Sequence, residues 1–184
     1  MPVIDPNHTW TLLEERLAVT TDERHRVVLK AVIEHMKAEA AADLDRMMAT
    51  LSPAPAYHFW YGGNDVGPKG TDGVRTYYSD FVASRSNVLE YTLDRLVLDD
   101  HCLVTEGFLK QIYPGTYAAQ LGFPVDDESA DYLIVHRQLL LWPVDGNGMI
   151  QGEDSYGTGP TSITKLSFEE LPQQYIDLVH SSVG

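Results

Sequence analysis

The chain has 184 residues, with 43% hydrophobic and 10% aromatic residues and 13 Lys and Arg against 27 Asp and Glu, a net charge of −14. A chain of this size can bury roughly 70% of its unfolded surface, enough for one core with a pocket. The composition excludes a disordered chain, and the acidic balance argues against nucleic acid and anionic membranes as partners. The single Cys102 excludes an internal disulfide and a multi-cysteine zinc site.

Targeting and membrane segments are not expected. The first residues lack the basic start and apolar core of a signal peptide. No apolar run approaches the roughly 18 residues that a membrane span needs. We therefore expect a cytoplasmic protein.

The N-terminal third predicts helices. Trp10, Leu13 and Leu17 indicate a short helix. From residue 21 to Ser52 the chain has no Gly or Pro and carries apolar residues at helical spacing, and Thr20 and Glu23 are spaced as a capping box. Because an alanine block covers residues 38–42, we expect about 30 helical residues kinked into two. Residues 1–20 are interpreted as an N-terminal extension of a single domain spanning residues 1–184.

The rest of the chain predicts one helix among strands. Residues 56–61 read as a short aromatic strand, and Thr71 and Asp72 cap a helix with a full apolar stripe. Residues 114–131 mix Pro, Gly and acids over a length typical of a lid or pocket rim. Two hairpins and a closing helix complete the expected elements: 91–98 with 102–113, 132–144 with 149–156 across the turn 145–148, and the helix 171–179.

Three segments carry a resemblance to a known family. They are Asp43–Leu51 running into the aromatic strand Tyr57–Trp60, followed by the glycine-bearing helix start Lys69–Tyr78. Together with the element order, they resemble the SnoaL-like branch of the nuclear transport factor 2-like superfamily, over roughly residues 21 to 157. The resemblance implies an α+β fold in which a cone-shaped, curved antiparallel sheet wraps around a long N-terminal helix. It also implies a cavity for a hydrophobic small molecule and a homodimer.

Glu106 is the first candidate for chemistry. It shares a strand face with the apolar residues Cys102, Val104, Phe108 and Ile112, so we expect its carboxylate to point into the cavity. Burial would raise its pKa and suit it to acid or base work. The structural alternative is an ion pair with an arginine of the same hairpin, such as Arg95.

His136 is the second candidate, and its partner depends on strand register. If the turn at 145–148 has an even residue count, Glu153 shares the face of His136, whereas an odd count puts Asp154 there. The resemblance favours Asp154, because SnoaL-like cyclases use an aspartate on the last strand as the base, with a histidine nearby. In this interpretation the hydroxyls of Tyr132 and Tyr156 are hydrogen-bond donors that stabilise an enolate. If the strands pair in the other register, Glu153 or Arg137 takes this role instead.

The first predicted strand, residues 56–61, is expected to form part of the pocket wall. His58 lies near the position where ketosteroid isomerases of this superfamily carry their catalytic acid, so that mechanism in its usual form is not expected here. Tyr57, His58 and Trp60 are interpreted as substrate-binding residues, together with Phe108. No His or Cys cluster has the spacing of a metal site, and no phosphate-binding loop occurs, so we expect neither metal nor cofactor.

Two functions follow from these expectations. The first is a cofactor-free acid–base enzyme, of the polyketide cyclase, isomerase or dehydratase type, in which Asp154 is the base, His136 its partner and Glu106 a second acid or base. The second is a non-catalytic module of the same fold that binds a small molecule or forms a dimer. Carboxylates locked in ion pairs with arginine would favour the second.

Overall fold

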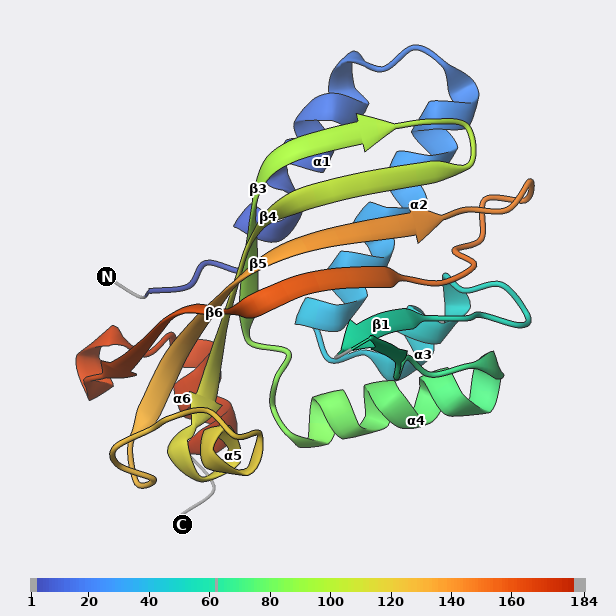
Figure 1. The fold of residues 1–184 in the computed structure, drawn as a ribbon. Coiled ribbons are helices and arrows are strands. Elements are labelled where there is room, and N and C mark those ends of the chain that lie inside the picture. Colours follow the sequence, from blue (N-terminus) through green and yellow to red (C-terminus); the bar gives the residue numbers. More distant parts are fainter. Residues whose placement is uncertain (1–2, 62, 181–184) are drawn as a thin grey trace.

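The computed structural model describes residues 3–61 and 63–180. Six helices and a six-stranded sheet make up the fold (Figure 1). The helices are α1 (His8–Val19), α2 (Glu23–Ala40), α3 (Leu44–Ala49), α4 (Gly70–Ala83), α5 (Gly115–Gln120) and α6 (Gln173–Val179), with a 3-10 turn at Phe168–Glu170. The strands are β1 (His58–Tyr61), β2 (Asn64–Asp65), β3 (Leu89–Leu98), β4 (Cys102–Pro114), β5 (Asp131–Pro143) and β6 (Asp154–Leu166).

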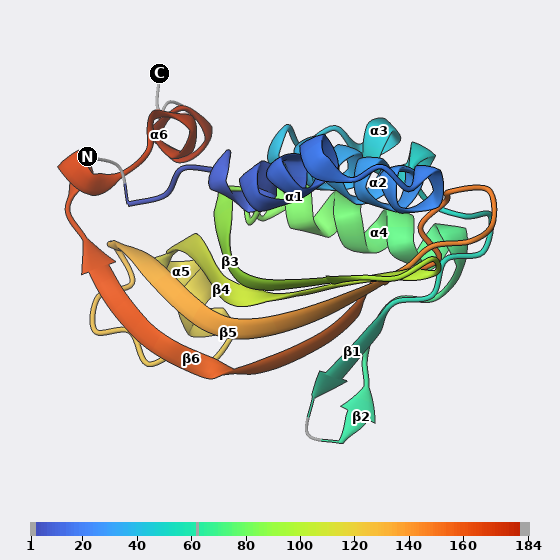
Figure 2. The same cartoon turned by 90° about the horizontal axis from the view of Figure 1, so that it is seen from above.

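The sheet has the strand order β2-β1-β6-β5-β4-β3 and is curved but not closed. Figure 2 shows helices α1 to α4 on the inner side of the curve, with the β1–β2 hairpin extending from one end. Strands β3 to β6 pair antiparallel, whereas β1 joins β6 in parallel. The predicted α+β fold with a curved sheet around helices is therefore confirmed, with one parallel pair added.

The curvature has local causes in the sequence. The pairing of β3 with β4 shifts between Leu93 and Arg95, and the pairing of β5 with β6 shifts on both sides of His136. Such irregularities bend a strand and increase its twist. At the bend of β4, a Cβ atom on Gly107 would come within 2.1 Å of the Thr92 carbonyl oxygen, so only glycine allows this approach.

The predicted kinked helix is two helices. Helix α2 begins at Glu23, because the Asp22 side chain accepts a hydrogen bond from the His25 N–H, and not at the expected Thr20 cap. It ends in the alanine block, where Ala42 has a φ of 53°, and α3 follows after the capping residue Asp43. The short helix α1 packs against α2 and β3, and its Leu13 belongs to the main core.

The last hairpin differs most from the prediction. Residues 145–148 do form a turn, in which the Gly148 N–H donates to the Asp145 carbonyl at 3.0 Å. However, the segment beyond it makes isolated bridges in place of a strand: Ile150 pairs antiparallel with Val144 and parallel with Leu51. Strand β6 starts at Asp154 and continues to Leu166, with Asp154 opposite Leu141 and Leu166 opposite Asp131. The sequence did not predict this strand beyond residue 156 because its polar and Gly-Pro composition is typical of a loop.

The main core lies between the helices and the inner face of the sheet. It contains the apolar faces of α2 and α4 and large strand residues such as Tyr91, Leu103 and Trp142. Within the residues that the structure describes, none of the helices has the length and apolar character needed to cross a membrane.

Candidate active site

A cavity of about 760 Å³ opens on the inner face of the sheet. Its walls come from α2 and α4 on one side and from β4, β5 and β6 on the other. Most of the lining side chains are apolar or aromatic, including Tyr77 and Phe81 on α4. The predicted rim at residues 114–131 is confirmed, because Tyr117, Leu121 and Phe123 line the cavity. A cavity of this size holds a molecule of drug-like dimensions.

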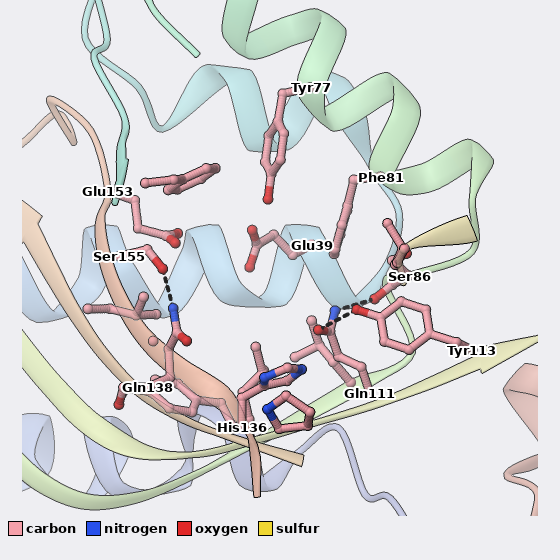
Figure 3. Close-up of a pocket in the computed structure, with 18 of the residues that line it drawn as sticks. Glu39, Tyr77, Phe81, Ser86, Gln111, Tyr113, His136, Gln138, Glu153 and Ser155 are labelled. Atoms are coloured by element: carbon pink, nitrogen blue, oxygen red, sulfur yellow. Dashed lines mark hydrogen bonds between the residues drawn. The ribbon is translucent and has the colours of Figure 1, made fainter. Parts of the chain in front are cut away.

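Two glutamates stand out among these apolar walls. Glu39 comes from the last turn of α2, and Glu153 immediately precedes β6. Figure 3 shows their carboxylates pointing toward each other inside the cavity, with the Tyr77 hydroxyl above Glu39. Neither forms an ion pair with a lysine or arginine among the described residues, and no Lys or Arg lines the cavity there. The two carboxylates are therefore left without compensating charge.

The surroundings change the protonation of both glutamates. Burial raises the pKa of Glu39 to about 7. Burial, followed by the charges of Glu39 and Asp154, raises the pKa of Glu153 well above its usual range. Because two close carboxylates cannot both ionise readily in an apolar site, they titrate as a pair. Near neutral pH the pair holds at least one proton, so it can both donate and accept one.

The nearest imidazole does not neutralise this pair. His35 is fully buried, its Nε2 lies 3.8 Å from Glu39 Oε1, and burial lowers the pKa of His35 to about 4. The Thr50 hydroxyl donates to the Met47 carbonyl at 2.7 Å and so accepts from His35 Nδ1 at 2.6 Å. His35 Nε2 then accepts from the Tyr78 hydroxyl at 2.7 Å. His35 is thus a neutral residue that ties α2 to α4.

Neutral polar groups occupy other parts of the wall. Gln138 on β5 donates to the Ser155 hydroxyl of β6, and Gln111 on β4 donates to the Ser86 carbonyl at 3.2 Å while accepting from the Tyr113 hydroxyl at 2.7 Å (Figure 3). Burial raises the pKa of Tyr77 well above its ordinary value, so its phenol stays protonated. These groups can hydrogen-bond a substrate oxygen without adding charge.

Two residues expected from the sequence line the cavity. His136 lies on the β5 side, where its Nδ1 is 3.4 Å from the Thr158 carbonyl and burial lowers its pKa, which favours the neutral ring. Trp60 lines the cavity near its exposed edge, with 48% of its surface accessible.

Asp154 and Glu106, the other two expected catalytic residues, do not line the cavity. Side chains alternate along β6, so Asp154 is on the opposite face from Glu153 and Ser155, and it does not line the cavity. Its Oδ1 is buried without a hydrogen-bond partner among the described residues, and burial raises its pKa. Glu106 is also on the outer face, in ion pairs with Arg95 at 3.1 Å and Arg137 at 2.7 Å. The expectation that Glu106 points inward is corrected, because the apolar residues sharing its strand face are on the outside.

The remaining expected wall residues do not line the cavity. Tyr57 is buried and its hydroxyl is 2.9 Å from that of Tyr78, while His58 hydrogen-bonds Asp65 at 2.7 Å. Tyr132 is buried under the loop that follows α5, where its hydroxyl donates to Asp126 at 2.5 Å. Phe108 lies under the Arg137 guanidinium, 4.7 Å from it, and Tyr156 is 47% exposed on the outer face.

The sequence did contain an indication of Glu39. The buried face of α2 runs through Val28, Val32 and Met36, and Glu39 continues that stripe three residues later. A carboxylate on an apolar stripe at the end of a helix is the kind of anomaly that points to a site. Glu153 was one of the two register alternatives, and its position in the cavity wall reflects the register that the fold adopts.

One surface group has the composition of a metal site. Among the described residues, Asp22, His25 and Asp100 have ligand atoms within 4.8 Å of one another, but they lie outside the cavity lining. Asp22 caps α2 through the His25 N–H, and His25 Nε2 pairs with Asp100 at 3.2 Å. These contacts account for the cluster as a surface arrangement.

Comparisons with known proteins place the fold. No family model matches the sequence, and no curated protein matches it. Similar solved structures include a protein named as a SnoaL-like polyketide cyclase from Shewanella putrefaciens CN-32, with 9% identity, TM-score 0.60, and 85% of this chain and 90% of that chain covered. An NTF2-like protein from Anabaena variabilis has 13% identity and TM-score 0.53 over 77% and 96% of the two chains.

A third structure carries a ligand. RV0760c from Mycobacterium tuberculosis, in complex with estradiol-17beta-hemisuccinate, has 15% identity and TM-score 0.52, with 71% of this chain and 92% of that chain covered. At such identities the likeness concerns the fold. The curved sheet and the helices on its inner face give this chain the fold of nuclear transport factor 2-like proteins, including SnoaL-like proteins of known structure.

Proposed function

We propose that this protein is a cofactor-free acid–base enzyme that moves a proton on a hydrophobic small molecule, in the manner of a cyclase, isomerase or dehydratase. The observation that carries the proposal is the pair Glu39 and Glu153, which faces an apolar cavity and has no cationic partner there. Carboxyl groups with raised pKa values in water-poor pockets are typical of proton-transfer sites.

In this proposal Glu153 removes and returns the proton. A base with a raised pKa takes a proton from carbon more readily than an ordinary carboxylate, since proton transfer follows basicity. The reacting carbon would lie next to a carbonyl, and the negative charge that develops on its oxygen would be stabilised by neutral donors of the wall, Tyr77 or Gln138. His136 is a second candidate for proton return, as it lines the same cavity.

The structural neighbours support the proposal in general terms. One is named as a polyketide cyclase, and another was crystallised with a steroid ester. Because this fold hosts many activities, the argument depends on the side chains of this chain and not on the fold.

The test is deuterium exchange, which needs no knowledge of the product. The protein is incubated in D2O with cyclic and linear ketones that bind it, and NMR follows exchange at the carbon next to the carbonyl. Glu153→Gln should slow this exchange by about a hundredfold or more, whereas Asp154→Asn, the neighbouring residue on the other face, should leave it nearly unchanged. Equal rates in wild type and Glu153→Gln would refute the assignment, and loss in Asp154→Asn would restore Asp154 as the base.

The alternative is a binding or dimerisation module without catalysis. Exposed apolar side chains on the outer sheet face, Val97, Phe108 and Tyr156, could serve a homodimer. Ketones that bind without any exchange above the buffer rate would favour this alternative.

A further inference from the structure

The charge of the cavity wall points to a particular class of ligand. Three carboxylates line it, those of Glu39, Asp80 and Glu153, and among the described lining residues there is no lysine or arginine. The one histidine of the wall, His136, has its pKa lowered by burial and stays neutral. A ligand entering this cavity therefore meets negative charge and no positive side chain.

Two other partly buried glutamates of the same protein are neutralised by cationic side chains. Glu90 on β3 is paired with Lys110 at 2.7 Å, and Glu106 on β4 is paired with two arginines. Glu153 lacks any such partner, and its carboxylate accepts no hydrogen bond from the described residues. Because an unpaired charge in an apolar site is costly, the missing partner of the cavity carboxylates is an indication of what the cavity binds.

Aromatic rings surround the same carboxylates. In Figure 3 the Tyr77 hydroxyl points toward Glu39 and Phe81 lies beside it, and the two rings are stacked with their centroids 6.4 Å apart. Phe59 approaches Tyr77 at 5.4 Å. Ring faces attract ammonium groups, most strongly where water is excluded. A carboxylate with aromatic rings beside it is thus complementary to an organic cation.

We propose that the substrate carries a basic nitrogen, and that its ammonium group binds Glu39 against the rings of Tyr77 and Phe81. This inference rests on the proposed function and gives the two glutamates different roles. Glu39 holds the substrate, whereas Glu153 remains available for the reacting carbon. Burial and then the charge of Glu39 keep Glu153 protonated, and an ammonium bound at Glu39 offsets the second of these, so the substrate itself would favour the basic form of Glu153.

The proposal predicts that binding depends on pH. An ammonium competes with the proton of Glu39, whose pKa is about 7. The titratable groups facing Glu39 are Glu153, His35, Tyr57, Tyr77 and Tyr78, and all of these except Glu153 stay neutral between pH 6 and 8. Because Glu39 titrates as a pair with Glu153, its ionised fraction rises between pH 6 and pH 8 less steeply than that of an isolated group, so amine affinity should rise by up to about tenfold.

The experiment compares three probes with the same apolar cage. They are 1-adamantylamine, 1-adamantanol and 1-adamantanecarboxylate, with binding to the full chain measured by calorimetry at pH 6 and pH 8. An aliphatic amine stays protonated at both values. We expect the amine to bind at least about tenfold more tightly than the alcohol at pH 8 and to weaken by up to about tenfold at pH 6. The alcohol should bind equally at both values, and the carboxylate should bind more weakly than the alcohol.

Two variants test whether Glu39 is responsible for the preference for the amine over the alcohol. Glu39→Gln should lose the preference for the amine while still binding the alcohol, and Asp154→Asn should keep the preference. An alcohol that binds as tightly as the amine at pH 8, or an amine affinity that does not change with pH, would overturn the inference. Both results come from the wild-type protein, so they do not depend on a variant folding. They would leave the proposed proton transfer intact, because deuterium exchange on a neutral ketone tests that separately.

Discussion

The replacement Glu39→Gln should stabilise the protein, and by an amount that depends on pH. Burial raises the pKa of Glu39 from its ordinary value of 4.5 to about 7. Between these two values the folded protein holds a proton that the unfolded chain has lost. Stability therefore falls as pH rises from 4.5 toward 7 and stays low above that. Glutamine keeps the shape of the side chain but cannot ionise, so the variant avoids this loss.

The size of the effect follows from the same values. A rise from 4.5 to about 7, at 1.36 kcal/mol per pH unit, corresponds to about 3 kcal/mol. The side chain of Glu39 is 15% exposed, so solvent screening reduces this only in part. For a chain of this length, about 3 kcal/mol changes the melting temperature by about 6–12 °C. Near pH 4.5 the two proteins should be almost equally stable.

The assay is thermal unfolding of wild type and Glu39→Gln at half-unit steps from pH 4.5 to 8. The difference between the two proteins is the informative quantity, because His35 acts in the opposite direction. Burial lowers the pKa of His35 to about 4, which makes the wild-type protein less stable as pH falls below 6.5. That contribution is present in both proteins, so most of it cancels in the difference.

A variant that is less stable than wild type at pH 8 would refute the reasoning. A difference that is the same at pH 5 and pH 8 would refute it as well, because it would show that Glu39 does not hold a proton in the folded state. Glu15→Gln, at an exposed position of α1, is the matched control.

Three further predictions test other parts of the structure. His35→Gln should remove part of the acid sensitivity, since neutral His35 contributes stability that is present above pH 6.5 and lost toward pH 4, as urea unfolding at both values would show. Gly107→Ala should cost about 2–4 kcal/mol in urea unfolding because its Cβ would meet the Thr92 carbonyl, while Gly146→Ala, with open space around it, should change little. The rate of deuterium exchange should rise with pH well above 4.5, following the raised pKa of Glu153, and an exchange rate that is flat from pH 5 to 8 would contradict that role.

Local sequence patterns predicted most of the elements correctly. The run without Gly and Pro predicted a long helix broken into two, which are α2 and α3. The turn residues around 99–100 predicted the β3–β4 hairpin. Strand β6 was predicted too short, because its stability comes from pairing along the whole of β5 and not from its own residues. Helix α2 is capped by Asp22 and not by Thr20, because Thr20 ends α1, where its N–H and hydroxyl both donate to the Arg16 carbonyl.

The sequence could not decide which strand face is concave. Glu106 and Phe108 share a face of mixed composition, and an apolar pattern of that kind suits either side of a half-covered sheet. The bulges around His136 and at Leu93, together with Gly107, set the direction of the curve. Once the curve is fixed, Glu106 meets Arg95 and Arg137 outside, while Gln111 and Gln138 face inward.

The acidic composition, the helices and most of the strands follow from the sequence alone, because they depend on residue content, local periodicity and turn chemistry. Tertiary structure decided the site. Glu39 and Glu153 are 114 positions apart in the chain and acquire raised pKa values only because α2 and the start of β6 enclose them in one apolar cavity. Burial and charge proximity are properties of the assembled fold, and a one-residue change in register exchanges Glu153 with Asp154.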